Sequence, residues 1–127
     1  MSKVIPFIEG KQIYLRQLVQ TDLENDYPTW FNDEEVCAHN SHHRFPMMLK
    51  DMQNYFDNEV SSRDNLILAI CDKESDKHVG NVSIMGIDSF NQSGEFAIIL
   101  GDRNFWGKGI GQEAARLIID HAFKQLN

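Results

Sequence analysis

Three glycines within five positions, Gly107, Gly109 and Gly111, stand where an apolar segment gives way to helix-forming sequence. Glycine in a helix interior costs roughly 1 kcal/mol relative to alanine, so this placement needs a compensating reason. A strand, a tight turn and a glycine-rich first helical turn leave unpaired backbone N–H groups at the positive end of a helix dipole, which suits an anion. Missing side chains let a phosphate approach the backbone closely. The simpler alternative is that the glycines only shape a strand-to-helix turn.

Two familiar phosphate-binding motifs fit this segment poorly. A Walker loop needs GxxxxGK[ST], whereas Gly111 is followed by Gln112 and Glu113. The dinucleotide spacing G-x-G-x-x-A is met by Gly109, Gly111 and Ala114. That fingerprint usually follows the first strand of a βαβ unit and needs a later strand with an acidic residue. Because this sequence has no such strand after the motif, a dinucleotide site is disfavoured.

The remaining sequence alternates strand and helix patterns without repeats, which predicts one α/β domain with a mixed sheet over residues 1–127. Gln12 to Leu18 alternates apolar and polar residues, as a half-buried strand does. Thr21 to Glu24 has capping-box spacing and predicts a helix running toward Trp30 and Phe31. An amphipathic helix is predicted over Leu49 to Val60, with Leu49, Met52, Tyr55, Phe56 and Val60 on one side. Three further strands are predicted over Leu66 to Cys71, Val79 to Ile87 and Glu95 to Leu100.

A final helix is predicted from about Gly109 to the end of the sequence. Its residues divide into a broad apolar face and a narrow polar stripe. A helix with so broad an apolar face is expected to be covered by other parts of a fold. The apolar face comprises Ala114, Ala115, Leu117, Ile118, Ile119, Ala122, Phe123 and Leu126, and the polar stripe Glu113, Arg116, Asp120 and Lys124.

Composition excludes several classes of function. The formal net charge of -7 argues against a general nucleic-acid binder, since phosphate backbones select clustered Lys and Arg. It suits a cationic acceptor, although acidity is equally common as a solubility feature. Cys37 and Cys71 are isolated, so they are expected to be reduced thiols of a cytoplasmic protein. No stretch approaches 18 apolar residues and the start lacks a cleavage pattern, so neither a membrane span nor export is expected.

The segment Trp106 to Gly111, WGKGIG, resembles the phosphate-binding signature Q/R-x-x-G-x-G/A of the GNAT family of N-acetyltransferases. It departs from that signature only at the first position, where Trp106 replaces Gln or Arg. The longer form WGKGIGQEA is similar to the branch that includes ribosomal-protein alanine, spermidine and amino-sugar acetyltransferases. The segments IYLRQL, TDL, WFNDEEV, a hairpin carrying Gly80 and Asn81, and GEFAIIL follow in the family's order. The resemblance covers nearly the whole chain.

The resemblance implies binding of acetyl-CoA and direct transfer of its acetyl group to an amine. The pyrophosphate would lie against the amides of Gly107 to Gln112. The pantetheine arm would pair with the backbone of the strand before the motif, where an N–H would also polarise the thioester carbonyl. The implied cofactor-binding residues are Ile99, Leu100, Gly101, Gly107, Lys108, Gly109, Ile110, Gly111 and Gln112.

Acetyl transfer requires that the amine lose a proton, and Glu95 is the candidate base. Members of the family often carry a Glu on this strand. Partial burial at the start of an apolar strand would raise its carboxyl pKa. A purely structural or edge carboxylate is the alternative. The tyrosine that often serves the family as general acid has no counterpart in this sequence.

A loop after the first helix carries Cys37, His39, His42 and His43 as C-x-H-x-x-H-H. These are metal-ligand residue types without an established zinc spacing, so no metal site is predicted. In the family this region lies beside the acceptor, and an inert surface loop is the alternative. The substrate contacts implied by the resemblance are Asn40, His42, His43 and Arg44.

The resemblance also implies a strand, a helix and a closing hairpin after the glycine-motif helix, which the sequence does not contain. The chain is therefore expected to be a C-terminally truncated GNAT domain, or to be covered by a partner chain, for example as a homodimer. The acceptor is left open among a protein N-terminus, a polyamine and an amino sugar. The alternative to an enzyme is a non-catalytic module that binds acyl-CoA or a nucleotide, or an inactive fragment that acts only by association.

Overall fold

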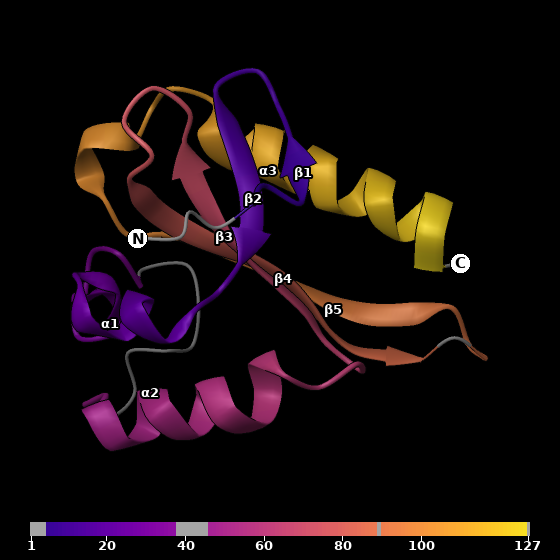
Figure 1. Ribbon diagram of the computed structural model, residues 1–127, viewed down its shortest axis with the longest axis horizontal. Helices are drawn as coiled ribbons and strands as arrows, with labels where there is room; N and C mark the ends of the chain where they lie inside the picture. The colour runs from indigo at the N-terminus through magenta and orange to yellow at the C-terminus, as the bar shows by residue number, and fades with distance from the viewer. Residues whose placement is uncertain (1–4, 38–45, 89, 127) are drawn as a thin grey trace.

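The computed structural model describes residues 5–37, 46–88 and 90–126, which form one five-stranded sheet with helices on both faces (Figure 1). The strand order follows the chain, β1-β2-β3-β4-β5, and every neighbouring pair is antiparallel. The predicted α/β fold class is confirmed, but over the described residues the sheet is antiparallel throughout rather than mixed. The strands are β1 (Ile8–Glu9), β2 (Ile13–Gln17), β3 (Leu66–Asp72), β4 (His78–Asp88) and β5 (Ser93–Leu100). The α-helices are α1 (Tyr27–Trp30), α2 (Leu49–Tyr55) and α3 (Ile110–His121). Shorter helical segments are η1 (Gln20–Glu24), η3 (Phe56–Val60), η4 (Arg103–Phe105) and η5 (Ala122–Leu126).

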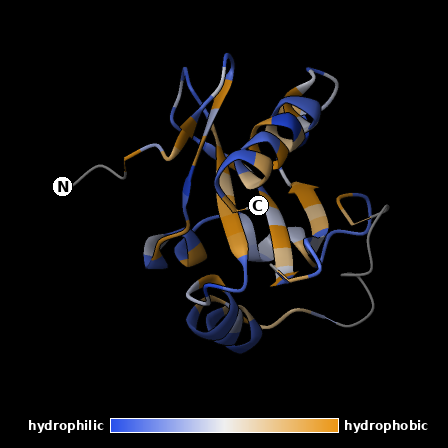
Figure 2. Ribbon diagram, turned by 90° about the vertical axis from the view of Figure 1, so that its right-hand side faces the viewer, coloured by the Kyte–Doolittle hydropathy of each residue, from blue (hydrophilic) through white to orange (hydrophobic). Residues whose placement is uncertain are grey.

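The sheet separates two hydrophobic cores, with α3 on one face and α1 and α2 on the other (Figures 1 and 2). The central strand β3 supplies both cores. Ile67, Ala69 and Cys71 point toward α1 and α2, while Leu68 and Ile70 point toward α3. This alternation explains why the sequence of β3 is apolar at successive positions, and the predicted strand over Leu66 to Cys71 is confirmed.

The predicted helix from Thr21 to Phe31 is wrong in its extent. The structure has the 3-10 turn η1 followed by the short helix α1, with Pro28 in the first turn of α1. Proline has no N–H to bond the carbonyl of Glu24, so one continuous helix through Pro28 would lose a hydrogen bond and suffer a clash. The carboxylate that caps η1 belongs to Asp22 and not to Glu24 of the predicted capping box. It accepts a hydrogen bond from the N–H of Val19 at 2.9 Å.

The predicted second helix is confirmed as α2 and its continuation η3, although one residue of its apolar side is misplaced. Met52 is buried, and Tyr55, Phe56 and Val60 pack against the core beneath the sheet. Leu49 is 70% exposed because it is the first helical residue, at the end that projects beyond this core. The periodicity therefore predicts the inner face correctly from Met52 onward.

A buried polar network joins β2, η1 and β4. The guanidinium of Arg16 donates two hydrogen bonds of 2.9 Å to the carboxylate of Asp22. Nδ1 of His78 lies 3.7 Å from Asp22, and its Nε2 lies 2.7 Å from Oδ1 of Asn81. Burial lowers the pKa of His78, so its ring is neutral at neutral pH. An amide oxygen only accepts, so the tautomer that forms the contact with Oδ1 of Asn81 is the one protonated at Nε2.

Glu113 belongs to the polar stripe predicted for the final helix, yet it is buried. Its side chain is buried beneath the turn between β1 and β2. The carboxylate accepts hydrogen bonds from the N–H groups of Lys11 at 2.6 Å and Gln12 at 3.1 Å, and from Nε2 of Gln12 at 3.2 Å. Burial by itself raises the pKa of Glu113, but these hydrogen bonds outweigh it and hold the pKa below its ordinary value.

We expect Glu113→Gln to lower the free energy of unfolding by about 1 to 3 kcal/mol at neutral pH, because a hydrogen-bonded carboxylate is lost. Because the pKa of Glu113 is lowered in the folded state, its ionised carboxylate stabilises the fold at pH values above the ordinary pKa near 4.5. This contribution is lost as the pH falls through the folded-state pKa. The difference between the wild type and the variant should therefore shrink in acid. Urea unfolding between neutral and strongly acidic pH measures it, with Glu24→Gln as an exposed control. A difference that is independent of pH would contradict this role.

Candidate functional site

The glycine-rich turn before α3 adopts a backbone that favours glycine. Gly107 and Gly109 have φ of 76° and 77°, in the left-handed region. A Cβ added to either residue would meet nothing within 4 Å, so packing against the rest of the fold does not explain these glycines. Their conformation and their open surroundings instead leave the backbone accessible from outside.

The first turn of α3 presents unpaired donors beside these glycines. The helix begins at Ile110, and its first backbone hydrogen bond runs from the N–H of Glu113 to the carbonyl of Gly109 at 3.1 Å. The N–H groups of Ile110, Gly111 and Gln112 precede that bond, and no side chain caps this end among the described residues. Together with the helix dipole they form a site suited to an anion such as a phosphate.

Residues on both sides hold this turn in place. Nε2 of Gln12 donates a hydrogen bond of 3.2 Å to the carbonyl of Lys108. Nζ of Lys108 lies 5.5 Å from the centre of the Phe105 ring, within the range of a cation–π interaction. The ammonium group of Lys108 thus adds positive charge beside the unpaired donors.

Trp106, the departure from the family's signature, joins the turn to the sheet. Its indole N–H donates a hydrogen bond of 2.7 Å to the carbonyl of Leu100, the last residue of β5. No local pattern in the sequence predicts this contact across the loop, because it joins Trp106 to a residue of the sheet. As a result, the carbonyl oxygen of Leu100 already accepts a hydrogen bond from within the chain.

The three strand residues predicted to meet the cofactor differ in the direction of their backbone groups. The N–H of Gly101 donates to the carbonyl of Val79 at 2.9 Å, so it faces β4. Antiparallel pairs alternate, and the register Asn81↔Ile99 places the backbone of Ile99 toward β4 as well. Leu100, like Ile98, directs its N–H to the outer edge of β5, where no described strand pairs with it.

Gly101 has a packing role that the sequence pattern does not predict. A Cβ at this position would lie 2.0 Å from Cδ2 of Trp30, so only glycine allows the indole to cross the strand end. Trp30 is buried in the core beneath α1. Gly101 therefore fixes the path of the chain from β5 into the glycine turn.

A pocket of about 650 Å³ runs along β5 on the face covered by α1 and α2. Its floor comes from β4 and β5, and its opposite wall from the two helices. The largest part of its lining is apolar or aromatic. The residues that line it are Tyr27, Phe31, Met47, Asp51, Met52, Tyr55, Ile67, Asn81, Ser83, Met85, Glu95, Phe96, Ala97, Ile98 and Ile99.

Glu95, the predicted base, lines this pocket, but its side chain is exposed. The expectation of partial burial is therefore wrong: the buried part of β5 is concentrated toward Ile99, whereas Glu95 lies near the turn that joins β4 to β5. The tyrosine hydroxyls of the pocket are protonated at neutral pH. Burial raises the pKa of Tyr55 to about 12, and burial also raises that of Tyr27.

The predicted acceptor residues Asn40, His42, His43 and Arg44 lie outside the described residues, as does His39. Cys37 is described, and it is a buried free thiol whose Sγ lies 3.3 Å from the carbonyl of Trp30. Over residues 5–37, 46–88 and 90–126, no group of three or more metal-ligating side chains comes together.

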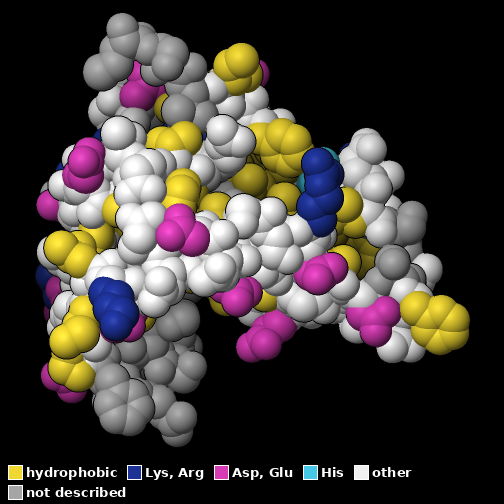
Figure 3. All heavy atoms as spheres, turned by 60° about the horizontal axis from the view of Figure 1, so that its bottom comes forward, with side chains coloured by type: hydrophobic (Ala, Val, Ile, Leu, Met, Phe, Trp, Pro, Cys, Tyr) yellow, Lys and Arg dark blue, Asp and Glu magenta, His cyan; other side chains and the backbone are white. Residues whose placement is uncertain are grey.

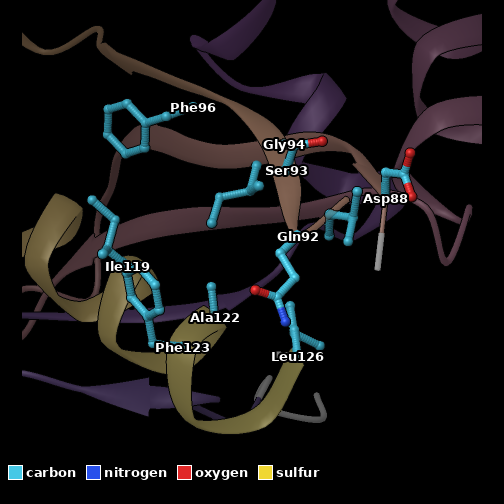
Figure 4. Close-up of a pocket in the computed structure, with 11 residues that line it drawn as sticks. Asp88, Gln92, Ser93, Gly94, Phe96, Ile119, Ala122, Phe123 and Leu126 are labelled. Atoms are coloured by element: carbon cyan, nitrogen blue, oxygen red, sulfur yellow. The ribbon is translucent and has the colours of Figure 1, made fainter. Parts of the chain in front are cut away.

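A second hollow, an apolar groove, lies on the other side of β5, between the β4–β5 hairpin and the end of α3. Figure 4 shows Phe96 from the strand and Ile119 and Phe123 from the helix around it. Phe123 is 69% exposed, and Ile119 and Leu126 are 40% exposed, whereas Ile118 is fully buried. The apolar face predicted for the final helix is thus buried along its inner half and exposed along its outer half.

Comparison with known proteins agrees with this architecture. A family model described as an acetyltransferase (GNAT) domain matches residues 12–127. An uncharacterized N-acetyltransferase p20 from Bacillus licheniformis is 42% identical over 55 residues, which cover 43% of this chain and 30% of that protein. In the part of the chain that the structure describes, none of the helices has the length and apolar character needed to cross a bilayer.

Two solved structures share the fold. The spermidine N-acetyltransferase from Vibrio cholerae, solved in complex with CoA and spermine, superposes with a TM-score of 0.77 at 19% identity, over 91% of this chain and 66% of that one. A GNAT-family acetyltransferase from Bacillus anthracis superposes with a TM-score of 0.75 at 17% identity, over 94% of this chain and 67% of that one. This chain thus spans about two thirds of the length of these structures. With the family model matched over residues 12–127, the chain belongs to the GNAT acetyltransferase domain family.

Proposed function

We propose that this chain binds acetyl-CoA and transfers its acetyl group to an amine. The observation that carries the proposal is the junction of the glycine turn with the free edge of β5, which the hydrogen bond from Trp106 to Leu100 holds together. Unpaired N–H groups at Ile110, Gly111 and Gln112 would bind the pyrophosphate. Membership of the family and the CoA complex of the Vibrio cholerae neighbour support the same ligand.

The direction of the backbone groups assigns different roles to the strand residues. The outward-facing groups of Ile98 and the N–H of Leu100 would pair with the amides of the pantetheine arm, as an added strand does. Ile99 would contribute its buried side chain to the pocket wall, and Gly101 the path of the chain. Lys108 would add a positive charge near the phosphates.

The chemistry requires one proton acceptor. The amine nitrogen attacks the thioester carbonyl carbon, the carbon–sulfur bond breaks, and the thiolate of coenzyme A leaves and takes up a proton. A backbone N–H at the strand edge would stabilise the oxyanion in the tetrahedral intermediate. Glu95 lines the pocket beside this edge and would take the proton from the attacking amine.

One observation favours a second candidate, a module that binds acyl-CoA without catalysis. Glu95 is exposed, so the structure does not enclose it together with a reacting amine. The same glycine turn and strand edge would then bind the ligand without turnover.

The homodimer and the cytoplasmic location stay predictions. Light scattering of the purified chain tests whether it forms a homodimer.

The test compares acetyl transfer and ligand affinity in the same variants. We expect Glu95→Gln to lower kcat by about 100-fold or more, while the dissociation constant of CoA changes little, because a general base acts on the chemical step. Release of the free thiol reports turnover, and calorimetry reports affinity. Glu74→Gln, in the exposed turn between β3 and β4, is the matched control. An unchanged rate would remove Glu95 as the base, and saturable CoA binding without turnover of any amine would favour the non-catalytic module.

A further inference from the structure

The pocket beside β5 carries negative charge and no positive charge among its described lining residues. Asp51 on α2 and Glu95 on β5 are its two carboxylates, and no Lys, Arg or His lines it. Both carboxylates are exposed, so they stand at the mouth rather than in the depth of the pocket. Figure 3 shows acidic side chains spread over the face that carries α2. An acceptor with a phosphate or carboxylate group would meet repulsion here and find no counter-charge among the described lining residues.

The interior of the pocket suits an aliphatic stem that carries a positive charge. Tyr27, Phe31 and Tyr55 supply aromatic side chains, and Met47 and Met52 add flexible apolar surface. Aromatic rings attract ammonium groups through their negative faces, and thioether side chains adapt to unbranched chains. The walls of the pocket and the carboxylates at its mouth therefore both suit an aliphatic ligand that carries a positive charge.

A hydroxyl on the floor of the pocket is accessible and has no hydrogen-bond partner among the described residues. Ser83 on β4 is 6% exposed and lines the pocket, and its hydroxyl makes no hydrogen bond with any described residue. Its neighbour across the strands is Ala97, which also lines the pocket. Glu95 lies one pair further along the same face, opposite Met85, so Ser83 and Glu95 are diagonal neighbours.

We infer that this pocket takes a cationic aliphatic amine without an anionic group, and that Ser83 positions its reacting nitrogen. The inference rests on the proposed function and narrows its acceptor. An N–H of the amine donates to Oγ of Ser83 while Glu95 takes the proton that must leave. Because Glu95 is engaged with the reacting amine, Asp51 on the helical wall attracts a second positive charge of the acceptor. The two carboxylates at the mouth disfavour an amino sugar attached to a nucleotide, because its phosphates would be repelled there.

The test uses two amines of equal length, hexamethylenediamine and ε-aminocaproate, titrated calorimetrically into the free chain and into the chain saturated with CoA. We expect the diamine to bind about tenfold or more tightly than aminocaproate at low ionic strength, and the ratio to fall as salt is added. Asp51→Asn should reduce this ratio several-fold. Asp57→Asn, which removes the same charge in the adjoining turn η3 but does not line the pocket, should leave the ratio unchanged.

Ser83→Ala removes the unpartnered hydroxyl without changing the size of the side chain appreciably. We expect it to weaken the binding of the diamine by about tenfold and to leave CoA affinity unchanged. Ser93→Ala, an exposed serine on β5, is the control. Equal or tighter binding of aminocaproate, failure of both amines to bind, or an unaffected Ser83→Ala variant would overturn the inference. Loss of CoA binding alone, with selective amine binding intact, would contradict the proposed function instead.

Discussion

Replacing Gly109 by leucine is expected to weaken CoA binding by about 100-fold. The backbone at this position has φ of 77° and lies open, directly before the unpaired donors of α3. A side chain here would occupy the space through which a phosphate reaches the amides of Ile110 and Gly111. Each hydrogen bond to a charged group contributes about 1.5 to 3 kcal/mol, so losing one or two of them accounts for an effect of this size. Calorimetric titration with CoA measures it.

Gly86 offers a matched control for the strain that leucine introduces. It has φ of 62°, a Cβ added there would meet nothing within 4 Å, and it lies in β4 far along the chain from the glycine turn. Gly86→Leu should therefore cost a comparable 1 to 2 kcal/mol or so of stability, while CoA affinity stays at the wild-type level. Equal losses of affinity in the two variants would assign the effect to strain and contradict a phosphate site at Gly109.

Removal of the Asp22 carboxylate should have the largest effect on stability. Asp22→Ala leaves the guanidinium of Arg16 buried without its counter-charge, and we expect the free energy of unfolding to fall by about 3 to 5 kcal/mol. Burial raises the pKa of Asp22, but the hydrogen bonds from Arg16 and Val19 outweigh it and keep the carboxylate ionised. Urea denaturation measures the loss.

Glu24→Ala is the control for this change, because Glu24 belongs to the same turn η1 but is exposed. It should shift the unfolding midpoint little. The charge removed is the same, so the comparison separates the buried ion pair from the net charge of the chain. A loss below about 1 kcal/mol for Asp22→Ala would show that Arg16 finds water or another partner, and would contradict the buried network.

Much of the fold could be predicted from local patterns. The apolar runs of β3 and β5 and the glycines before α3 mark their elements clearly, since buried strands and helix starts have distinct compositions. The capping-box spacing at Thr21 was misleading, because Pro28 prevents a continuous helix and Asp22 is the residue that caps. A spacing rule describes one turn and does not include a proline several residues later.

The candidate site could be predicted only in part, because its remaining features depend on contacts between distant segments. The register of β4 against β5 decides that Leu100 faces the edge while Ile99 and Gly101 face inward. The link from Trp106 to Leu100 and the free hydroxyl of Ser83 follow from tertiary packing. No periodicity or motif in the sequence encodes which backbone group is left unpaired.

Amide mapping by two-dimensional proton–nitrogen spectra during titration with CoA tests the central claim most directly. The proposed site predicts saturable shifts that are largest for the N–H groups of Ile98, Leu100 and Gly109 to Gln112. The N–H groups of Ile99 and Gly101 should change less, because they face β4 and the carbonyl of Val79. Absent shifts, or shifts confined to the apolar groove between the β4–β5 hairpin and α3, would contradict the claim that this edge and this helix start bind the coenzyme.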